Sequence, residues 1–157
     1  MPITPLHFGV LAPINHFTKY RISVWSFGLV NLWIDLPIIL AVMSGEAFPP
    51  REDTHSMIII LIIGTLVAMP GVRSARWVIG AYYGALTHWL LDSLVHSDMQ
   101  PFSWMEGNPL YMGWMEPLSW ALMPLTAWAL IQCMSNAQES LRKKQEAFRA
   151  WRKQKVS

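Results

Sequence analysis

Histidine and aspartate recur at every fourth residue in the stretch from Gly80 to Asp98. His88, Asp92 and His96 follow one another at this spacing, among residues that are mainly Leu, Val, Trp, Tyr and Ala. On an α-helix such residues share one face, with roughly 5–6 Å between neighbouring Cβ atoms. Imidazole nitrogen and carboxylate oxygen are the ligand types of zinc and related divalent ions. The spacing therefore predicts a helix that carries a polar stripe suited to metal binding.

Composition indicates that this helix lies in a membrane. The 157 residues are 53% hydrophobic and 14% charged, whereas about 25% of the residues of a typical soluble domain are charged. The chain also contains nine Trp, a residue type that favours membrane interfaces. The single Cys133 cannot form an internal disulfide. We therefore expect an all-α membrane protein rather than a soluble or disulfide-stabilised domain.

Apolar stretches predict about four transmembrane helices in one membrane domain, residues 1–134. Pro37 interrupts the first of these stretches, and proline removes a backbone donor, so a kink is expected there. Gly80 and Gly84 lie four residues apart and would let a neighbouring helix pack closely against the third. The expected spans are residues 22–44, 54–71, 75–96 and 113–134.

Both ends of the chain are expected to form further helices. Residues 3–16 are apolar but too short to span a bilayer, so they predict an interfacial or re-entrant helix that begins at Thr4 and Pro5. Residues 135–157 predict a basic cytoplasmic helix. Two interpretations of this tail are possible: an amphipathic helix that binds anionic lipid, or a solvated helix that only fixes the topology. Nucleic-acid binding is not expected.

The distribution of positive charge predicts the orientation. Lys and Arg mark the cytoplasmic side of membrane proteins. Four spans place the basic segments on one side and the acidic loops 45–55 and 97–112 on the other, with both termini cytoplasmic. The basic segments contain Lys19, Arg21, Arg73, Arg76 and the tail residues Arg142, Lys143, Lys144, Arg149, Arg152, Lys153 and Lys155.

This topology brings more polar residues to the level of the stripe. Ionisable groups within a span cost roughly 2.5–3.5 kcal/mol on insertion scales, so they are functional candidates by default. Three metal ligands would leave a position for water activated as a nucleophile, with a spare carboxylate, Asp35 or Asp92, as general base. His16, Glu106 and Glu116 are expected in solvated turns and loops. The predicted metal ligands are His55, His88, Asp92, His96, Asp35 and, where the N-terminal helix reaches the same depth, His7.

Four short motifs resemble those of the membrane-bound metal-dependent hydrolase-like family, the LexA-binding, inner-membrane-associated hydrolases, and especially its small bacterial members. The resemblance covers residues 1 to about 130 and lacks one aspartate of the family's acidic motif. It implies a bacterial inner-membrane protein and a metal-dependent hydrolase. The motifs are Pro-Leu-His7-Phe-Gly, Trp33-Ile34-Asp35-Leu36-Pro37, Thr54-His55-Ser56 and the segment from Gly84 to Asp92.

The residues support two classes of function. The first is hydrolysis of an ester or phosphoester, plausibly of a lipid that partitions into the membrane, through water activated by zinc or manganese. The second is a non-catalytic membrane protein in which the His and Asp layer holds the helices together, carries protons or senses metal.

Overall fold

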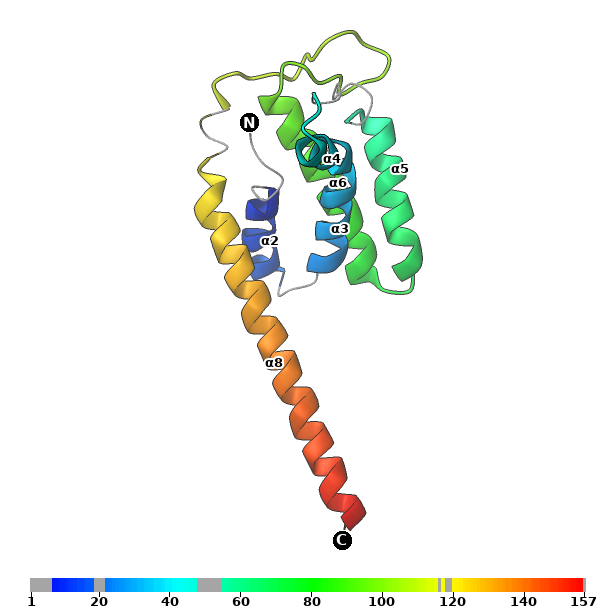
Figure 1. The fold of residues 1–157 in the computed structure, drawn as a ribbon, viewed down its shortest axis with the longest axis vertical. Coiled ribbons are helices and arrows are strands. Elements are labelled where there is room, and N and C mark those ends of the chain that lie inside the picture. The colour runs from blue at the N-terminus through cyan, green and yellow to red at the C-terminus, as the bar shows by residue number, and fades with distance from the viewer. Residues whose placement is uncertain (1–6, 19–21, 48–54, 116, 118–119, 157) are drawn as a thin grey trace.

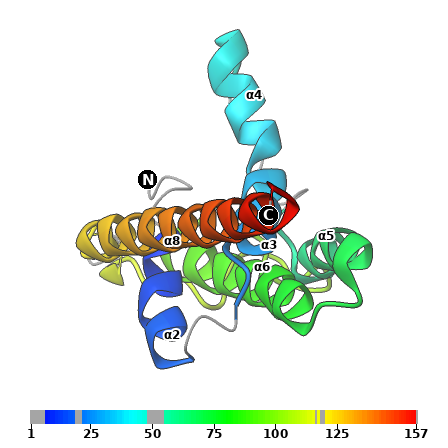
Figure 2. The same ribbon diagram turned by 90° about the horizontal axis from the view of Figure 1, so that it is seen from below.

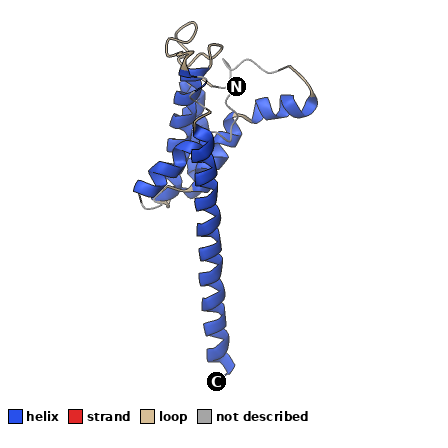
Figure 3. Cartoon of the chain, turned by 90° about the vertical axis from the view of Figure 1, so that its left-hand side faces the viewer, coloured by secondary structure: helices blue, strands red, loops and turns tan. Residues whose placement is uncertain are grey.

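All regular structure in the described chain is helical. The computed structural model describes residues 7–18, 22–47, 55–115, 117 and 120–156, and these contain no strand (Figure 3). The expected all-α class is therefore confirmed. The elements are η1 (Phe8–Val10), α2 (Leu11–Phe17), α3 (Val24–Ile34), α4 (Leu36–Ser44), α5 (Met57–Ala68), η3 (Met69–Gly71), α6 (Ala75–Val95) and α8 (Leu122–Val156).

Helix α6 is the centre of the fold, with α3 and α5 packed against it (Figure 1). The Ser74 hydroxyl accepts from the Trp77 backbone N–H and caps its start, as serine does at many helix N-termini. The main core cluster joins side chains of all three helices, including Val30, Ile60 and Ala85. The helix occupies almost the whole of the predicted span 75–96. Its apolar sequence and its N-cap, Ser74, lie within or next to the helix, so both are encoded locally in the sequence.

The α3–α6 contact depends on two glycines, as their spacing predicts. A Cβ atom at Gly80 would lie 2.3 Å from Ser26 Oγ and 2.5 Å from the Ser23 carbonyl oxygen. A Cβ at Gly84 would lie 2.5 Å from Val30 Cγ1. Real contacts of this kind do not occur, so the helices could not stay this close with larger residues. The expected close packing along Gly80 and Gly84 is confirmed.

Gly80→Ala is expected to lower the free energy of unfolding by about 1–3 kcal/mol, the usual cost of overpacking a core. The gain of about 1 kcal/mol in helix propensity does not compensate, because backbone atoms of Ser23 cannot move aside alone. Denaturant titration monitored by circular dichroism measures the change. The matched control is Gly28→Ala, where the new Cβ meets only the mobile end of Phe8 at 3.1 Å. Equal stability of both variants would contradict this account of the α3–α6 contact.

The first predicted span, residues 22–44, contains two helices in place of one kinked helix. It consists of α3 and α4, which bend by 57° at Asp35. The expected kink is confirmed, and it lies two residues before Pro37, which falls in the first turn of α4. Proline has no N–H and its ring clashes with the carbonyl four residues earlier, so the helix must break upstream. Helix α4 then points away from the bundle (Figure 2).

The two ends of the chain also differ from the predictions in detail. The N-terminal helix is present as η1 and α2, whereas Thr4 and Pro5 lie outside the described residues. The fourth helix, expected at 113–134, is instead α8, which starts at Leu122 and continues through the tail without a break at residue 134. Starting there puts Pro124 in the first turn, where a missing N–H costs little.

Taken singly, none of the described helices has both the length and the apolar character needed to cross a membrane. Helices α3 and α4 meet that requirement as a bent pair, and α5 with η3 is a shorter apolar helix.

Candidate metal centre

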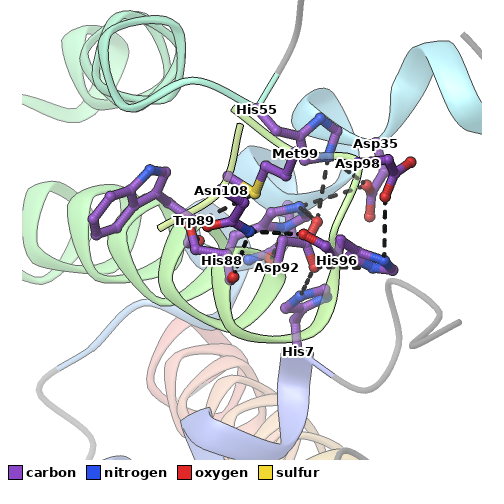
Figure 4. Close-up of polar contacts among 12 residues, drawn as sticks. His7, Asp35, His55, His88, Trp89, Asp92, His96, Asp98, Met99 and Asn108 are labelled. Atoms are coloured by element: carbon purple, nitrogen blue, oxygen red, sulfur yellow. Dashed lines mark hydrogen bonds and ion pairs between the residues drawn. The ribbon is translucent and has the colours of Figure 1, made fainter. Parts of the chain in front are cut away.

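Four buried side chains from three parts of the fold converge on one point (Figure 4). Asp35 lies at the α3–α4 bend, His55 precedes α5, and His88 and Asp92 lie one turn apart on α6. One potential ligand atom from each residue lies within 4.8 Å of the other three. Their exposed fractions are 6%, 0%, 0% and 3%, respectively. The structure thus brings together four of the six predicted metal residues.

Nitrogen and oxygen atoms alternate around this point. His55 Nε2 lies 3.4 Å from Asp35 Oδ1 and 3.4 Å from Asp92 Oδ2. His88 Nε2 lies 3.5 Å from the same Asp35 oxygen and 3.3 Å from the same Asp92 oxygen. A tetrahedral ion with bonds of about 2.0–2.1 Å holds its ligand atoms about 3.3–3.4 Å apart. The four measured separations are therefore close to the spacing that one bound ion requires.

Asn31 determines which nitrogen of His88 faces this point. The Asn31 amide Nδ2 donates to the Phe27 carbonyl at 2.7 Å, so its Oδ1 accepts from His88 Nδ1 at 2.9 Å. His88 Nδ1 therefore carries a hydrogen, and Nε2 points at two carboxylate oxygens. This buried Nε2 has no hydrogen-bond partner in the described part of the chain. A proton or a metal ion between these atoms would balance the negative charge of the two carboxylates.

Asn31 was not among the predicted metal residues. It lies four residues before Asp35, so both belong to the same face of α3. That spacing is the signal that could have identified it as a partner of the site. Residues that orient a metal-ligating histidine through its second nitrogen tune metal affinity.

Asn31→Leu is expected to weaken metal binding by about 10–100-fold, because His88 loses the bond that fixes its ring and tautomer. Competition against a chromogenic chelator measures the affinity. Thr87→Ala is the matched control, since this neighbour of His88 donates its hydroxyl to the Tyr83 carbonyl at 2.7 Å and not to the site. Unchanged affinity in the Asn31 variant would show that His88 is held without it.

His7 and His96 lie beside the four-residue group rather than in it. His7 Nε2 is 3.1 Å from Asp92 Oδ1, and its ring stacks on that of His88 with centroids 4.2 Å apart. His96 Nε2 is 3.8 Å from the same oxygen. Asp92 therefore directs Oδ2 at His55 and His88 and Oδ1 at His7 and His96. The N-terminal helix does reach the depth at which His7 meets the site.

The remaining sequence candidates lie elsewhere. His16 is exposed and packs against Trp128, with ring centroids 5.7 Å apart. Glu106 is exposed in the loop after α6. His16 lies in the last turn of α2 rather than in a connecting turn, and Glu116 lies outside the described residues.

The loop after α6 closes the site from one end. Asn108, which was not among the predicted site residues, donates its Nδ2 to the carbonyls of Ser93 and His96, at 2.7 Å each. These carbonyls end α6 and have no partner within the helix. Pro101 accepts bonds from the Met57 N–H at 2.9 Å and from Trp89 Nε1 at 3.1 Å. The loop therefore fastens α5 to α6 next to His55.

The chemistry of the donors fits a divalent ion. Two buried carboxylates carry two negative charges, and buried charges are tolerated only when they are compensated. One divalent ion between Asp35 and Asp92 would balance them, with two neutral imidazoles completing the set. Nitrogen and oxygen donors in this proportion suit zinc and related metals. Asp35, His55, His88 and Asp92 lie close enough to hold a metal ion.

Comparison of the chain with family models, with curated proteins and with solved structures finds no match. The resemblance to the membrane-bound metal-dependent hydrolase-like family therefore stays a prediction that rests on the short motifs. The chemistry inferred for the site therefore rests on the geometry of its own residues.

Proposed function

We propose that this chain is a membrane-embedded hydrolase that cleaves an ester or phosphoester bond with the help of one divalent metal ion, zinc or manganese. One observation carries the proposal. His88 Nε2 is fully buried, has no hydrogen-bond partner among the described residues, and faces Asp35 Oδ1 at 3.5 Å and Asp92 Oδ2 at 3.3 Å. Two buried carboxylates are costly in a protein interior unless cations balance their charge, and one divalent ion would balance both.

The residues have separate roles in this proposal. An ion held by His55, His88 and Asp92 would supply Lewis-acid chemistry that activates water as a nucleophile near neutral pH. Asp92 is held by His7 and both ligating histidines, which makes it a fixed ligand. Asp35, at the helix bend and the most exposed of the four, is the candidate proton acceptor. Carboxylates act as general bases when they lie beside the reacting water.

Exposed apolar side chains support the membrane placement. Trp25 and Met43 are each 79% exposed, and Ile62 is 53% exposed. Large apolar surfaces of this kind mark contact with lipid or with another apolar partner. Lipid around the helices also favours a substrate that partitions into the membrane.

Charge supports a cytoplasmic orientation of one end of the bundle. Arg73 lies in the α5–α6 turn and Arg76 in the first turn of α6. This is the end of the bundle toward which α8 extends (Figure 1). The basic part of α8 continues beyond that end, where it would meet the anionic inner leaflet of a bacterial inner membrane. The site lies at the opposite end of α6. The proposed cytoplasmic location of the N-terminus concerns residues 1–6, which lie outside the described residues.

Metal analysis of the purified protein tests the proposal. After reconstitution with zinc or manganese, we expect one ion per chain in the wild type and none in the His88→Ala, Asp92→Ala double variant. A screen of esters, phosphoesters and phospholipids should then show activity only in the metal-loaded wild type. Wild-type protein that stays metal-free after reconstitution would reject the hydrolase. Activity lost with metal still bound would instead indicate acid–base roles for the two residues.

Enclosure of the site favours a second candidate, a non-catalytic metal or packing centre. All four donors are at most 6% exposed, and four protein ligands complete a tetrahedral structural site, whereas catalytic sites keep one position open. Replacement of the ion by cobalt discriminates between the two, because the visible spectrum reports the coordination number. A spectrum that changes on addition of a small anion supports an open, catalytic position. An unresponsive four-coordinate spectrum supports the closed centre.

A further inference from the structure

A groove lies at the other end of the bundle, between the starts of α3 and α6 and the middle of α8. It has a volume of about 790 Å³ and is lined mainly by apolar side chains, among them Ile22, Trp25, Trp77, Leu130 and Leu141. Arg76 on its wall is 12 residues before His88 (88 − 76), or about 18 Å along α6 at 1.5 Å per residue. The groove is therefore separate from the metal centre.

A positively charged side chain lies at the wall of this groove. Arg76 is exposed and makes no ion pair with any residue that the structure describes. Ser140 lines the groove and also lines a neighbouring hollow that contains Lys144. Lys144 likewise makes no ion pair within the described ranges. Arg76 thus offers a cation at the wall of the apolar groove, and Lys144 offers a second one in the neighbouring hollow, which Glu139 and Lys143 also line.

We propose that this groove binds one acyl chain of an anionic phospholipid, with the phosphate held by Arg76 and Lys144. Ligand pockets of about 300–1,000 Å³ are typical for small molecules, with apolar walls and a few polar groups that fix orientation. Arginine pairs with phosphate through two parallel hydrogen bonds. The basic end of the bundle is also the end proposed to face the anionic leaflet. The site does not depend on the metal centre or on hydrolysis.

Cys133 provides the probe for this site. It is the only cysteine of the chain, it is half-buried, and it lines the groove. The experiment follows alkylation of Cys133 by a small maleimide in the purified full-length protein in detergent. Phosphatidylglycerol is added in one series, phosphatidylcholine with the same acyl chains in a second, and inorganic phosphate in a third. We expect phosphatidylglycerol alone to slow the reaction several-fold at matched concentration.

Arg76→Gln is expected to abolish this protection, whereas Arg73→Gln should keep it, since Arg73 lies just before α6 and does not line the groove. Native mass spectrometry should show one retained phosphatidylglycerol in the wild type and none in the Arg76 variant. Unchanged circular dichroism and metal content establish that the variant is folded. Equal protection by both lipids, protection by phosphate alone, or protection that survives in Arg76→Gln would each overturn the proposal.

Discussion

Asp92→Asn is expected to abolish metal binding, with a loss larger than the about 10–100-fold that follows removal of an outer hydrogen-bond partner. The substitution keeps the size of the side chain but removes a charge that lies 3.4 Å from His55 Nε2 and 3.3 Å from His88 Nε2. The remaining Asp35 cannot neutralise a divalent ion alone. Elemental analysis of the protein after dialysis, together with chelator competition, measures the loss.

Asp98→Asn is the matched control for that experiment. Asp98 follows α6 on the same segment, and its side chain is 60% exposed and 4.0 Å from His96 Nδ1. An exposed ion pair at that distance contributes little, so this variant should bind metal as the wild type does. Retention of one ion per chain with unchanged affinity in Asp92→Asn would remove Asp92 from the site.

Removal of the metal by a chelator is expected to lower the thermal stability of the wild type substantially. An ion that binds only the folded state stabilises it by about 2.7 kcal/mol when its free concentration is 100 times the Kd. Without the ion, the Asp35 and Asp92 carboxylates share one buried space, and Coulomb repulsion between them adds to the loss. Thermal unfolding in detergent, scanned at several free zinc concentrations, measures the shift.

The His88→Ala, Asp92→Ala double variant is the control for this measurement. Its unfolding temperature should not change with zinc or chelator, since two of the four ligands are gone. A wild type that unfolds at the same temperature with and without zinc would show that the four side chains do not bind the ion in the folded state.

Local features explain which parts of the structure could be predicted. Helix α6 was expected over 75–96 and forms over Ala75–Val95, because its cap and apolar run are encoded next to each other. The convergence of His55, His88, Asp92 and Asp35 was also expected, since antiparallel helices of known length bring their equivalent depths together. These predictions used only the spacing of residues along the chain and the distribution of positive charge.

Features that depend on contacts between distant segments could not be predicted in the same way. The direction of α4 after the Asp35 bend depends on where its apolar side chains are accommodated, and Pro37 indicates only that a break occurs. The bonds from Asn108 to Ser93 and His96 join a loop to a helix end. The spacing of Asn31 before Asp35 was visible, but its partner His88 is 57 residues away.

The chain positions of the four donors have a consequence for folding. Residues 35, 55 and 92 belong to separate segments, and Asp35 and Asp92 lie 57 positions apart in the sequence (92 − 35). A bond between such residues acts as a cross-link, and the chain-entropy model gives about 4 kcal/mol for a loop of that length. A bound ion would thus restrict the unfolded chain much as a disulfide does. It would tie together three segments of a protein whose single cysteine cannot form such a bond within the chain.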